Sequence, residues 1–340
     1  MPEFELIVGQ KQPIRILHAH LRNGTVPHAL LFKGIDGIGK KSTAMTFAMA
    51  CNCDERSDLS SPPKNQGTIN PCGHCRSCRK MMSGNHPDII HIAPSGSYIK
   101  IGQIRSLIHT LSLKPYEANC RTVLISEAHS MNPEASNALL KVLEEPPSQT
   151  VLILTARQSS DLLPTVVSRC QQIKFNPLSP EDLTELLVKK NGVDRQTSEV
   201  IAIMANGSYT KAATMIGSDW IDRRKWLLHA SGLDKPREGS VWPVHRHLAF
   251  VETLMQNKNT VVESLEIMKS WLRDLVIFHY SPDHIINQDL KAEVHQASQD
   301  INLESLLAKI DAIQFAQKTI QSNANLKLAL ETMIFKIASA

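Results

Sequence analysis

In the first half of the chain the spacing of hydrophobic residues switches repeatedly between two patterns. Short continuous runs, typical of buried strands, alternate with residues three or four apart, typical of helices. Short apolar runs predict buried strands at Ala29–Phe32, Asp88–Ile92, Arg121–Ser126 and Val151–Thr155. Apolar residues three or four apart predict helices at Lys11–Arg22, from Lys40 onward, at Ile101–Leu113 and at Pro133–Glu144. Because strands that alternate with helices usually pair in parallel, this half is predicted to be an α/β domain whose sheet is covered on both faces.

The second half carries helical periodicity without a strand signal. Helices are predicted at Glu181–Lys190, Arg195–Ala205, Tyr209–Ile216, Leu248–Leu254, Val261–Tyr280 and Leu303–Lys336. Pro177 and Pro180 interrupt the preceding pattern and Ser179 can cap the next helix, which places a boundary there. The segment Leu233–Pro243 is rich in proline and glycine and is predicted to be a loop or linker. The predicted domains are an α/β domain at 1–176, a small helical domain at 177–230 and an all-α domain at 240–340.

A glycine-rich turn joins the first predicted strand to the helix that begins near Lys40. Gly34, Gly39 and Lys40 satisfy the pattern G-x-x-x-x-G-K, and Gly37 lies between them. In such a loop backbone N–H groups turn toward phosphate oxygens, the helix N-terminus adds partial positive charge, and the lysine reaches the terminal phosphates. The sequence therefore predicts a phosphate-binding loop. A glycine-rich turn without a ligand is the plainer interpretation of the same residues.

Two positions that would hold magnesium in such a site depart from the usual pattern. The residue after the loop lysine is Lys41 in place of Ser or Thr, with Ser42 displaced by one. The strand that ends in Ser126 would normally end in Asp, although Glu127 keeps the next position, where an ordinary exposed carboxylate is the plainer interpretation. An ammonium cannot ligate a metal, so hydrolysis by this chain is not expected. Binding of ATP or ADP without magnesium stays an open alternative.

Between Cys51 and Asn85 the apolar periodicity gives way to Ser, Pro, Asn, Gly and Cys, so this insertion is predicted to be held by something other than a core. Cys72, Cys75 and Cys78 are spaced to converge on one metal ion, and Cys53 or Cys51 would complete the tetrahedral set that structural Zn²⁺ prefers. An iron–sulfur cluster is the other metal that these spacings allow, and His74 is a less favoured ligand. Three unrelated reduced cysteines are the plainer alternative.

Composition narrows the class of protein. A chain of 340 residues with 42% hydrophobic residues is long enough for two or three domains with their own cores. Lys and Arg total 37 against 33 for Asp and Glu, and this net charge of +4 is too small to indicate a surface that coats nucleic acid. No apolar run reaches the ~20 residues of a membrane span and no signal peptide is visible, so a cytoplasmic protein without membrane contact is expected.

Several strings taken together resemble a known family. HALLFKG with the glycine loop, CGHCRSC, EAHSMNPEASNALLKVLEEPP and LLPTVVSRC are similar to segments of the bacterial clamp-loader subunits of the AAA+ class, and among them to the delta-prime type of DNA polymerase III. The resemblance spans roughly Val8–Phe175, about half of the chain. It implies a RecA-like AAA+ domain with a zinc module at about 51–85, a small helical lid, and an all-α C-terminal collar. It also implies a hetero-oligomeric ring with motor and delta subunits, which meets the sliding clamp and primer-template DNA through the complex.

The resemblance assigns further roles. Cys53 takes the place of the family's first zinc ligand beside Cys72, Cys75 and Cys78. Arg169 takes the place of the arginine that reaches across a subunit interface to a neighbour's ATP, the arginine finger, whereas without the resemblance a salt bridge at a strand end is the better interpretation. Thr210, with Lys211 beside it, occupies the place of a lid arginine that senses the γ-phosphate in active members.

The usual magnesium-binding and phosphate-sensing residues are replaced at Lys41, Ser126 and Thr210, which favours a stator of the delta-prime type over a motor. Arg157 also matches the residue pattern of the delta-prime type. The alternative functions are an active clamp-loader ATPase or another DNA-dependent AAA+ ATPase. A zinc-bearing nucleic-acid module unrelated to ATPases is disfavoured because no aromatic residue lies between Cys51 and Tyr98.

Overall fold

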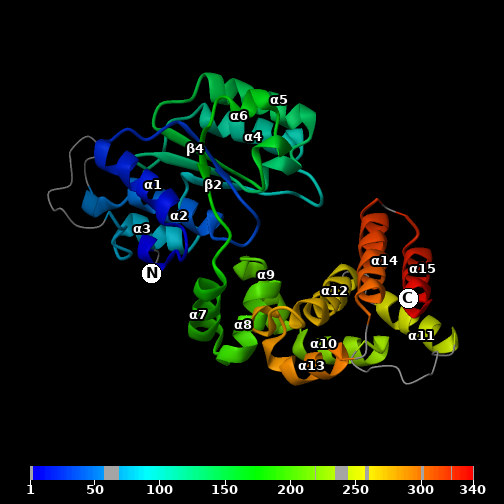
Figure 1. The fold of residues 1–340 in the computed structure, drawn as a ribbon. Coiled ribbons are helices and arrows are strands. Elements are labelled where there is room, and N and C mark those ends of the chain that lie inside the picture. The colour runs from blue at the N-terminus through cyan, green and yellow to red at the C-terminus, as the bar shows by residue number, and fades with distance from the viewer. Residues whose placement is uncertain are drawn as a thin grey trace. The chain divides into compact units, whose positions relative to one another are not determined.

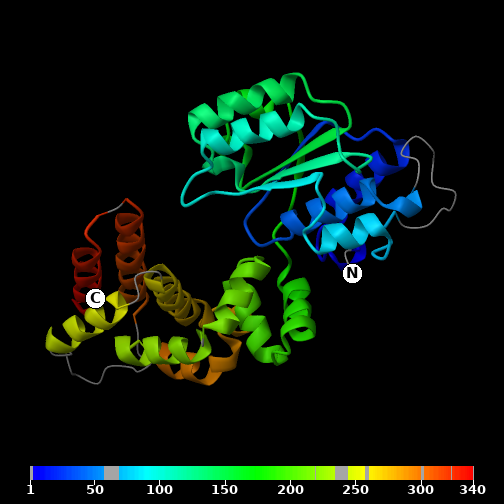
Figure 2. The same cartoon turned by 180° about the vertical axis from the view of Figure 1, so that it is seen from behind.

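The structure is a computed structural model that describes residues 3–56, 69–218, 220–233, 244–256, 260–299, 302–322 and 324–339. It divides into two compact units, one of Met1–Leu186 with Ala205–Lys211 and one of Leu187–Met204 with Ala212–Ala340. Figures 1 and 2 show the ribbon from opposite sides, with the β-sheet in the first unit and helices in the second. Most of the predicted linker, residues 234–243, lies outside the described residues. The boundaries of the three predicted domains stay predictions.

The first unit is built on a five-stranded sheet with the order β2-β3-β4-β1-β5, in which every pairing is parallel. The strands are β1 (Ala29–Lys33), β2 (Ile89–Ile92), β3 (Arg121–Ile125), β4 (Thr150–Ala156) and β5 (Gln171–Lys174). The parallel α/β architecture expected from the sequence is therefore confirmed. The strand β5 was not predicted, because only Ile173 of its four residues is buried and an edge strand of this kind has no apolar run.

Helices cover both faces of this sheet, as Figures 1 and 2 show. They are α1 (Lys11–Asn23), α2 (Lys40–Cys51), α3 (Arg76–Met82), α4 (Ile101–Leu111), α5 (Pro133–Glu144) and α6 (Pro164–Val167). Alternation along β1 separates two cores: Leu31 packs with α4 and α5, whereas Leu30 and Phe32 pack with α1 and α2. Burial on both faces explains why the strands appear in the sequence as continuous apolar runs.

The second unit contains helices alone among its described residues. Two helices, α7 (Pro180–Asn191) and α9 (Tyr209–Gly217), have residues in both units. The others are α8 (Arg195–Met204), α10 (Trp220–Ser231), α11 (Val244–Met255), α12 (Val261–Phe278), α13 (Lys291–Ser298), α14 (Leu303–Gln321) and α15 (Leu326–Ser339). The core of this unit includes Trp271, which is 1% exposed and donates from its indole N–H to the carbonyl of Leu233 at 2.8 Å.

The prediction of one long helix over Leu303–Lys336 was wrong, because the chain forms α14 and α15 there. The polar residues between them favour turns over helix: Ser322 ends α14, and the side chain of Asn325 accepts a hydrogen bond from the N–H of Leu328 at the start of α15. The helices α3, α6, α10 and α13 were not predicted. In the part of the chain that is described, no helix is long and apolar enough to cross a bilayer.

Candidate functional sites

The glycine-rich loop lies at the carboxyl end of β1, where β1 is flanked by β4 and β5. Gly34, Gly37 and Gly39 all have positive φ angles, of 152°, 78° and 94°, which side-chain-bearing residues rarely adopt. The N–H of Gly34 donates to the carbonyl of Ala156 on β4 at 3.1 Å, and Gly39 is followed directly by α2. In open parallel sheets ligands bind at this edge, which is where the predicted phosphate loop lies.

The loop lysine is turned back onto its own loop. Lys40 is only 7% exposed, and its Nζ donates to the carbonyls of Gly34 and, at 2.7 Å, of Ile35. The Oδ1 of Asp36 lies 3.6 Å from the same ammonium, and the other carboxylate oxygen pairs with Arg157 at 2.7 Å. Burial lowers the pKa of Lys40 despite the opposing effect of Asp36. The ammonium is thus bonded to loop carbonyls and to an acidic side chain.

The segment 205–211 packs directly against the loop. The N–H of Tyr209 donates to the carbonyl of Gly37 at 3.0 Å. A Cβ atom added to Gly37 would lie 2.4 Å from the hydroxyl oxygen of Ser208 and 2.8 Å from the Cβ of Thr210. Thr210, expected at the place of a sensing arginine, therefore does lie beside the loop, and a hydroxyl side chain carries no guanidinium to meet a phosphate.

The region where magnesium would be held contains the Lys41 ammonium and the uncharged side chain of Ser126, with the exposed carboxylate of Glu127 beside them. The ring nitrogen Nε2 of His91, on β2, lies 2.8 Å from the hydroxyl oxygen of Ser126 at the end of β3. Burial, followed by the nearby Lys41 ammonium, lowers the pKa of His91 and favours its neutral form. Lys41, Ser42 and Glu127 are exposed. Sequence reasoning missed His91, which is the one polar position in the apolar segment IIHI.

Glu127 has a backbone conformation that is uncommon for a residue with a side chain. Its φ angle is 52°, in the left-handed region, and its N–H donates to the hydroxyl oxygen of Thr155 on β4 at 3.1 Å. Its carbonyl accepts a hydrogen bond from the hydroxyl of Ser130 at 2.7 Å. These backbone bonds fix the residue at the carboxyl edge of the sheet and leave the carboxylate exposed.

Arg169 lies on the surface between α6 and β5. One guanidinium nitrogen is 2.7 Å from a carboxylate oxygen of Glu144, the last residue of α5, and another donates to the carbonyl of Thr165 at 2.9 Å. Its side chain is 35% exposed. The ion pair is the contact expected of a plain structural arginine, and the exposure leaves part of the guanidinium accessible.

Four cysteines form a compact thiol cluster. The sulfur atoms of Cys53, Cys72, Cys75 and Cys78 all lie within 4.8 Å of one another, with 4.0 Å between those of Cys72 and Cys78. Tetrahedral Zn²⁺ with bonds of about 2.3 Å needs sulfurs ~3.8 Å apart, so the set fits one ion. Backbone N–H groups of Cys72, Cys75 and Cys78 approach the sulfurs of Cys53, Cys72 and Cys75 at 3.3–3.4 Å. Such contacts stabilise thiolates.

The other candidate ligands lie outside this cluster. Cys51 is buried in the core between the sheet and α1 and α2, so Cys53 is the residue that joins the other three. His74 is turned toward Glu55, with 2.6 Å between ring nitrogen and carboxylate oxygen. The prediction that the insertion lacks a core needs correction, because Met81 and Cys78 of α3 pack with Met49 of α2 in a small hydrophobic cluster.

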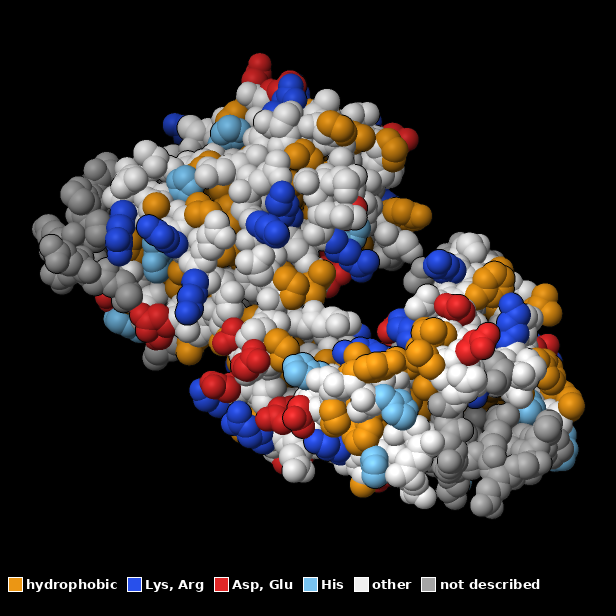
Figure 3. All heavy atoms as spheres, in the orientation of Figure 1, with side chains coloured by type: hydrophobic (Ala, Val, Ile, Leu, Met, Phe, Trp, Pro, Cys, Tyr) orange, Lys and Arg blue, Asp and Glu red, His pale blue; other side chains and the backbone are white. Residues whose placement is uncertain are grey.

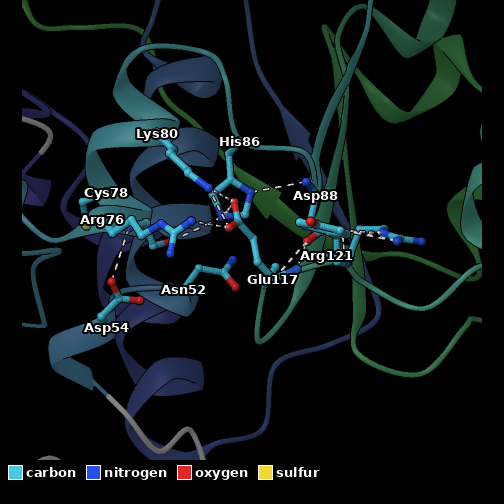
Figure 4. Close-up of polar contacts among 12 residues, drawn as sticks. Asn52, Asp54, Arg76, Cys78, Lys80, His86, Asp88, Glu117 and Arg121 are labelled. Atoms are coloured by element: carbon cyan, nitrogen blue, oxygen red, sulfur yellow. Dashed lines mark hydrogen bonds and ion pairs between the residues drawn. The ribbon is translucent and has the colours of Figure 1, made fainter.

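A polar network ties this module to the sheet (Figure 4). The Glu117 carboxylate accepts from Lys80 at 2.6 Å and lies 3.9 Å from Arg76, both on α3. Asp88 is 1% exposed and accepts hydrogen bonds from three backbone N–H groups, of residues 116–118, and from Arg121. Burial opposes ionisation of Asp88, but these bonds outweigh it and hold the carboxyl pKa below its usual value.

Comparisons with known proteins agree with this architecture. A family profile described as DNA polymerase III, delta subunit, matches residues 9–179, and a second profile, for the C-terminal part of the same family, matches residues 244–339. The chain is 27% identical over 332 residues to DNA polymerase III subunit delta' of Bacillus subtilis, covering 96% of each protein. It is 27% identical to the delta' subunit of Haemophilus influenzae over 294 residues, 86% of this chain and 83% of that protein.

Relatives of the tau type match about half of this chain. DNA polymerase III subunit tau of Escherichia coli is 33% identical over 184 residues, which is 54% of this chain and 27% of tau. Among solved structures, a gamma subunit-related protein of Thermotoga maritima is similar at 16% identity, with 96% and 97% of the two chains covered and a TM-score of 0.44. The profile matches and the nearly full-length match to a delta' subunit establish the family. The chain belongs to the delta-prime family of DNA polymerase III clamp-loader subunits.

Proposed function

We propose that this chain is a stator of the clamp loader, which takes part in loading the sliding clamp during DNA replication without hydrolysing ATP itself. In this proposal it completes the ATP site of a neighbouring motor subunit with the arginine finger Arg169. The observation that carries the proposal is the pair formed by His91 and Ser126, next to Lys41, in the place where an ATPase would hold magnesium. A cation and a neutral pair offer Mg²⁺ no carboxylate to bind.

The glycine loop supports the same conclusion. The Lys40 ammonium is already bonded to the carbonyls of Gly34 and Ile35, so a nucleotide would have to displace these bonds before it gained a contact. Gly37 is packed against Ser208 and Thr210, and neither supplies a charge for a γ-phosphate. Phosphoryl transfer depends on positioning and on neutralisation of charge, and these residues provide little of either. The loop is proposed to serve as a structural joint.

The properties of Arg169 support its proposed role as an arginine finger at the ATP site of a neighbouring subunit. A guanidinium is permanently charged and presents a planar fork that matches phosphate oxygens. Its partner Glu144 is half exposed, and exposed ion pairs of this kind contribute only about 0–1 kcal/mol, so a neighbour's phosphate can replace the carboxylate at small cost. The short α6 and the edge strand β5 hold the arginine at the end of the sheet.

We propose that the thiol cluster binds one structural Zn²⁺ through Cys53, Cys72, Cys75 and Cys78. Four protein ligands would fill the tetrahedral shell and leave no position for a substrate. The iron–sulfur alternative is less well supported, because thiolates around a multi-iron cluster lie further apart than the 4.8 Å limit found here. Zinc would fix the loop of 72–78 and so the position of α3.

The helical unit supports assembly into a ring with motor and delta subunits. Apolar side chains are exposed on its last two helices, at Leu303, Leu307, Phe315 and Leu328. Residues 303 and 307 lie one turn apart on α14, so they share a face of that helix. An exposed apolar face on a helical collar is suited to packing against another subunit. Contact with the sliding clamp and with primer-template DNA is proposed to come through that complex.

The alternative function is a working ATPase, and the 33% identity to tau over 54% of the chain favours it. ATP turnover by the purified chain separates the two. The stator proposal expects negligible turnover with magnesium, with or without primed DNA. A rate near ~1 s⁻¹, the low end for ordinary enzymes, would establish the alternative.

Reconstitution tests the arginine finger. Replacing Arg169→Ala in a ring rebuilt with its motor and delta subunits is expected to lower ATPase activity by about 10³-fold at the site it completes, while the ring still assembles. Glu144→Gln is the matched control, since it breaks the same ion pair and keeps the guanidinium. Equal activity of the Arg169→Ala ring and the unmodified ring would remove the assigned role.

A further inference from the structure

A groove of about 800 Å³ runs along α1 in the first unit, and its lining includes no residue of the glycine loop or thiol cluster and not Arg169, although Ile7 of the lining lies 3.7 Å from the Cβ position of Gly39. Its walls come from the N-terminal segment of residues 4–9 and from α1 itself, with Asp182 also in the lining. The volume lies in the range of ligand and peptide sites. No part of the proposed stator role uses it.

Basic side chains from one face of α1 line this groove. Lys11, Arg15, His18 and Arg22 all line it, and their spacing of four, three and four residues places them on one face of α1. The rise of a helix sets their total span at about 16 Å. Lys11, Arg15 and Arg22 are exposed. Figure 3, in the orientation of Figure 1, shows Lys and Arg side chains gathered over the region where α1 is drawn.

These three cations lack acidic partners within the described part of the first unit, where Lys11, Arg15 and Arg22 make no ion pair with a carboxylate. Two carboxylates, of Glu5 and Asp182, line the same groove from other segments. The opposite face of α1 is committed to the core through Leu17 and Leu21. The cationic line is therefore a surface feature that folding of this chain does not use.

The floor of the groove is apolar. Ile7, Val8, Ile14 and Ala19 line it together with the cations. Phe4 is the one phenylalanine, tyrosine or tryptophan in the lining. It is 1% exposed, and its ring is nearly perpendicular to that of His18, with 4.7 Å between their centroids. Single-stranded nucleic acid binds to exposed aromatic faces as well as to cations, and this groove offers none. An amphipathic helix uses both an apolar floor and a charged rim.

We propose that this groove is a docking site for an acidic amphipathic helix of a partner protein. Carboxylates spaced along about three turns would meet Lys11, Arg15 and Arg22, and aliphatic side chains on the adjoining face would contact Ile14 and Ala19. Complementary charge would speed association and fix the register of the helix. The chemistry of the groove identifies the partner only as acidic and helical.

Fluorescence anisotropy with the full chain tests this proposal. The probe is a labelled synthetic helix with glutamates at positions i, i+4, i+7 and i+11 and leucines on the adjoining face. Binding in the micromolar range that weakens with salt is expected, and Arg15→Glu with Arg22→Glu is expected to weaken it by about tenfold or more. The matched control, Arg105→Glu with Lys114→Glu, makes the same change of charge at exposed positions of the same unit and is expected to leave affinity within about twofold.

A second variant tests the groove itself. Ala19 is an exposed residue of α1 that lines the groove, so Ala19→Trp fills the groove without changing the charge. This variant is also expected to weaken binding of the synthetic helix. Thermal unfolding of each variant verifies that the fold is kept. Absence of binding, equal loss in both double variants, or unchanged affinity of Ala19→Trp would overturn the proposal. Tighter binding of a single-stranded oligonucleotide with the same dependence on Arg15 and Arg22 would overturn it in favour of a nucleic-acid surface.

Discussion

The Nε2 atom of His91 lies 2.8 Å from the Oγ of Ser126, across the carboxyl ends of the neighbouring strands β2 and β3. The pair fills the edge of the sheet where the carboxylate of a magnesium-binding aspartate would be needed. Burial and the Lys41 ammonium both lower the pKa of His91, so at neutral pH the pair is neutral while Lys41 adds a positive charge beside it. The proposed loss of magnesium binding is therefore assigned to three side chains, Lys41, His91 and Ser126.

Restoring two of these positions is expected to restore magnesium dependence. The double variant Lys41→Thr with Ser126→Asp removes the ammonium and adds a hydroxyl and a carboxylate, which are ligands that Mg²⁺ accepts. Binding of a fluorescent ATP analogue should become about tenfold tighter with Mg²⁺ than without it, a gain of ~1.4 kcal/mol. The parent chain serves as the control, and no difference between the two proteins would contradict this account of the site.

Removal of one thiolate is expected to release the metal. Cys75→Ser removes both a ligand and the sulfur that accepts the N–H of Cys78, so the purified variant should contain close to no zinc and the first unit should unfold at a lower temperature. Elemental analysis and thermal scans measure both effects. Cys120→Ala is the control, because this thiol is buried elsewhere and burial raises its pKa to about 11, which keeps it protonated. Equal zinc content in the two variants would argue against the assigned ligands.

Replacing Asp88→Asn is expected to destabilise the first unit by about 3–5 kcal/mol at neutral pH, because Arg121 stays buried without its counter-charge. The native pKa of Asp88 is lowered from 3.8, so its contribution is present above that value and is lost as pH falls through the lower native pKa. Urea unfolding at several pH values should therefore show a flatter acid limb for the variant. Glu134→Gln, at an exposed carboxylate, should match the parent chain.

Packing of the segment 205–211 on the glycine loop makes Gly37 hard to replace. In Gly37→Ala the new methyl group would lie 2.4 Å from the Ser208 hydroxyl at a φ angle of 78°, so a loss of roughly 1–3 kcal/mol in unfolding free energy is expected. Gly102→Ala is the matched control: no atom lies within 4 Å of its Cβ position and the residue is helical, so a gain of up to about 1 kcal/mol is expected. Denaturant titration compares them, and equal losses would remove the packing argument.

The apolar pattern by itself determined the parallel sheet. Strands buried on both faces are continuous apolar runs such as Val151–Thr155, and their alternation with helical patterns indicated parallel pairing. The spacing of Cys72, Cys75 and Cys78 likewise predicted that their thiols converge, since thiols so close in sequence can meet through local backbone, and the structure brings them together with Cys53. The strand β5 could not be predicted from an apolar run. Only Ile173 of its four residues is buried, so the segment contains no continuous hydrophobic stretch.

Tertiary structure decided what depends on segments far apart in the chain. The sequence could not show that His91 would meet Ser126. It placed Cys53 rather than Cys51 in the cluster only through the family resemblance. Sheet order and packing bring these groups together, and neither is encoded in local spacing. The groove beside α1 is of the same kind: its line of cations is visible in the sequence, but its apolar floor forms only when residues 4–9 fold against the helix.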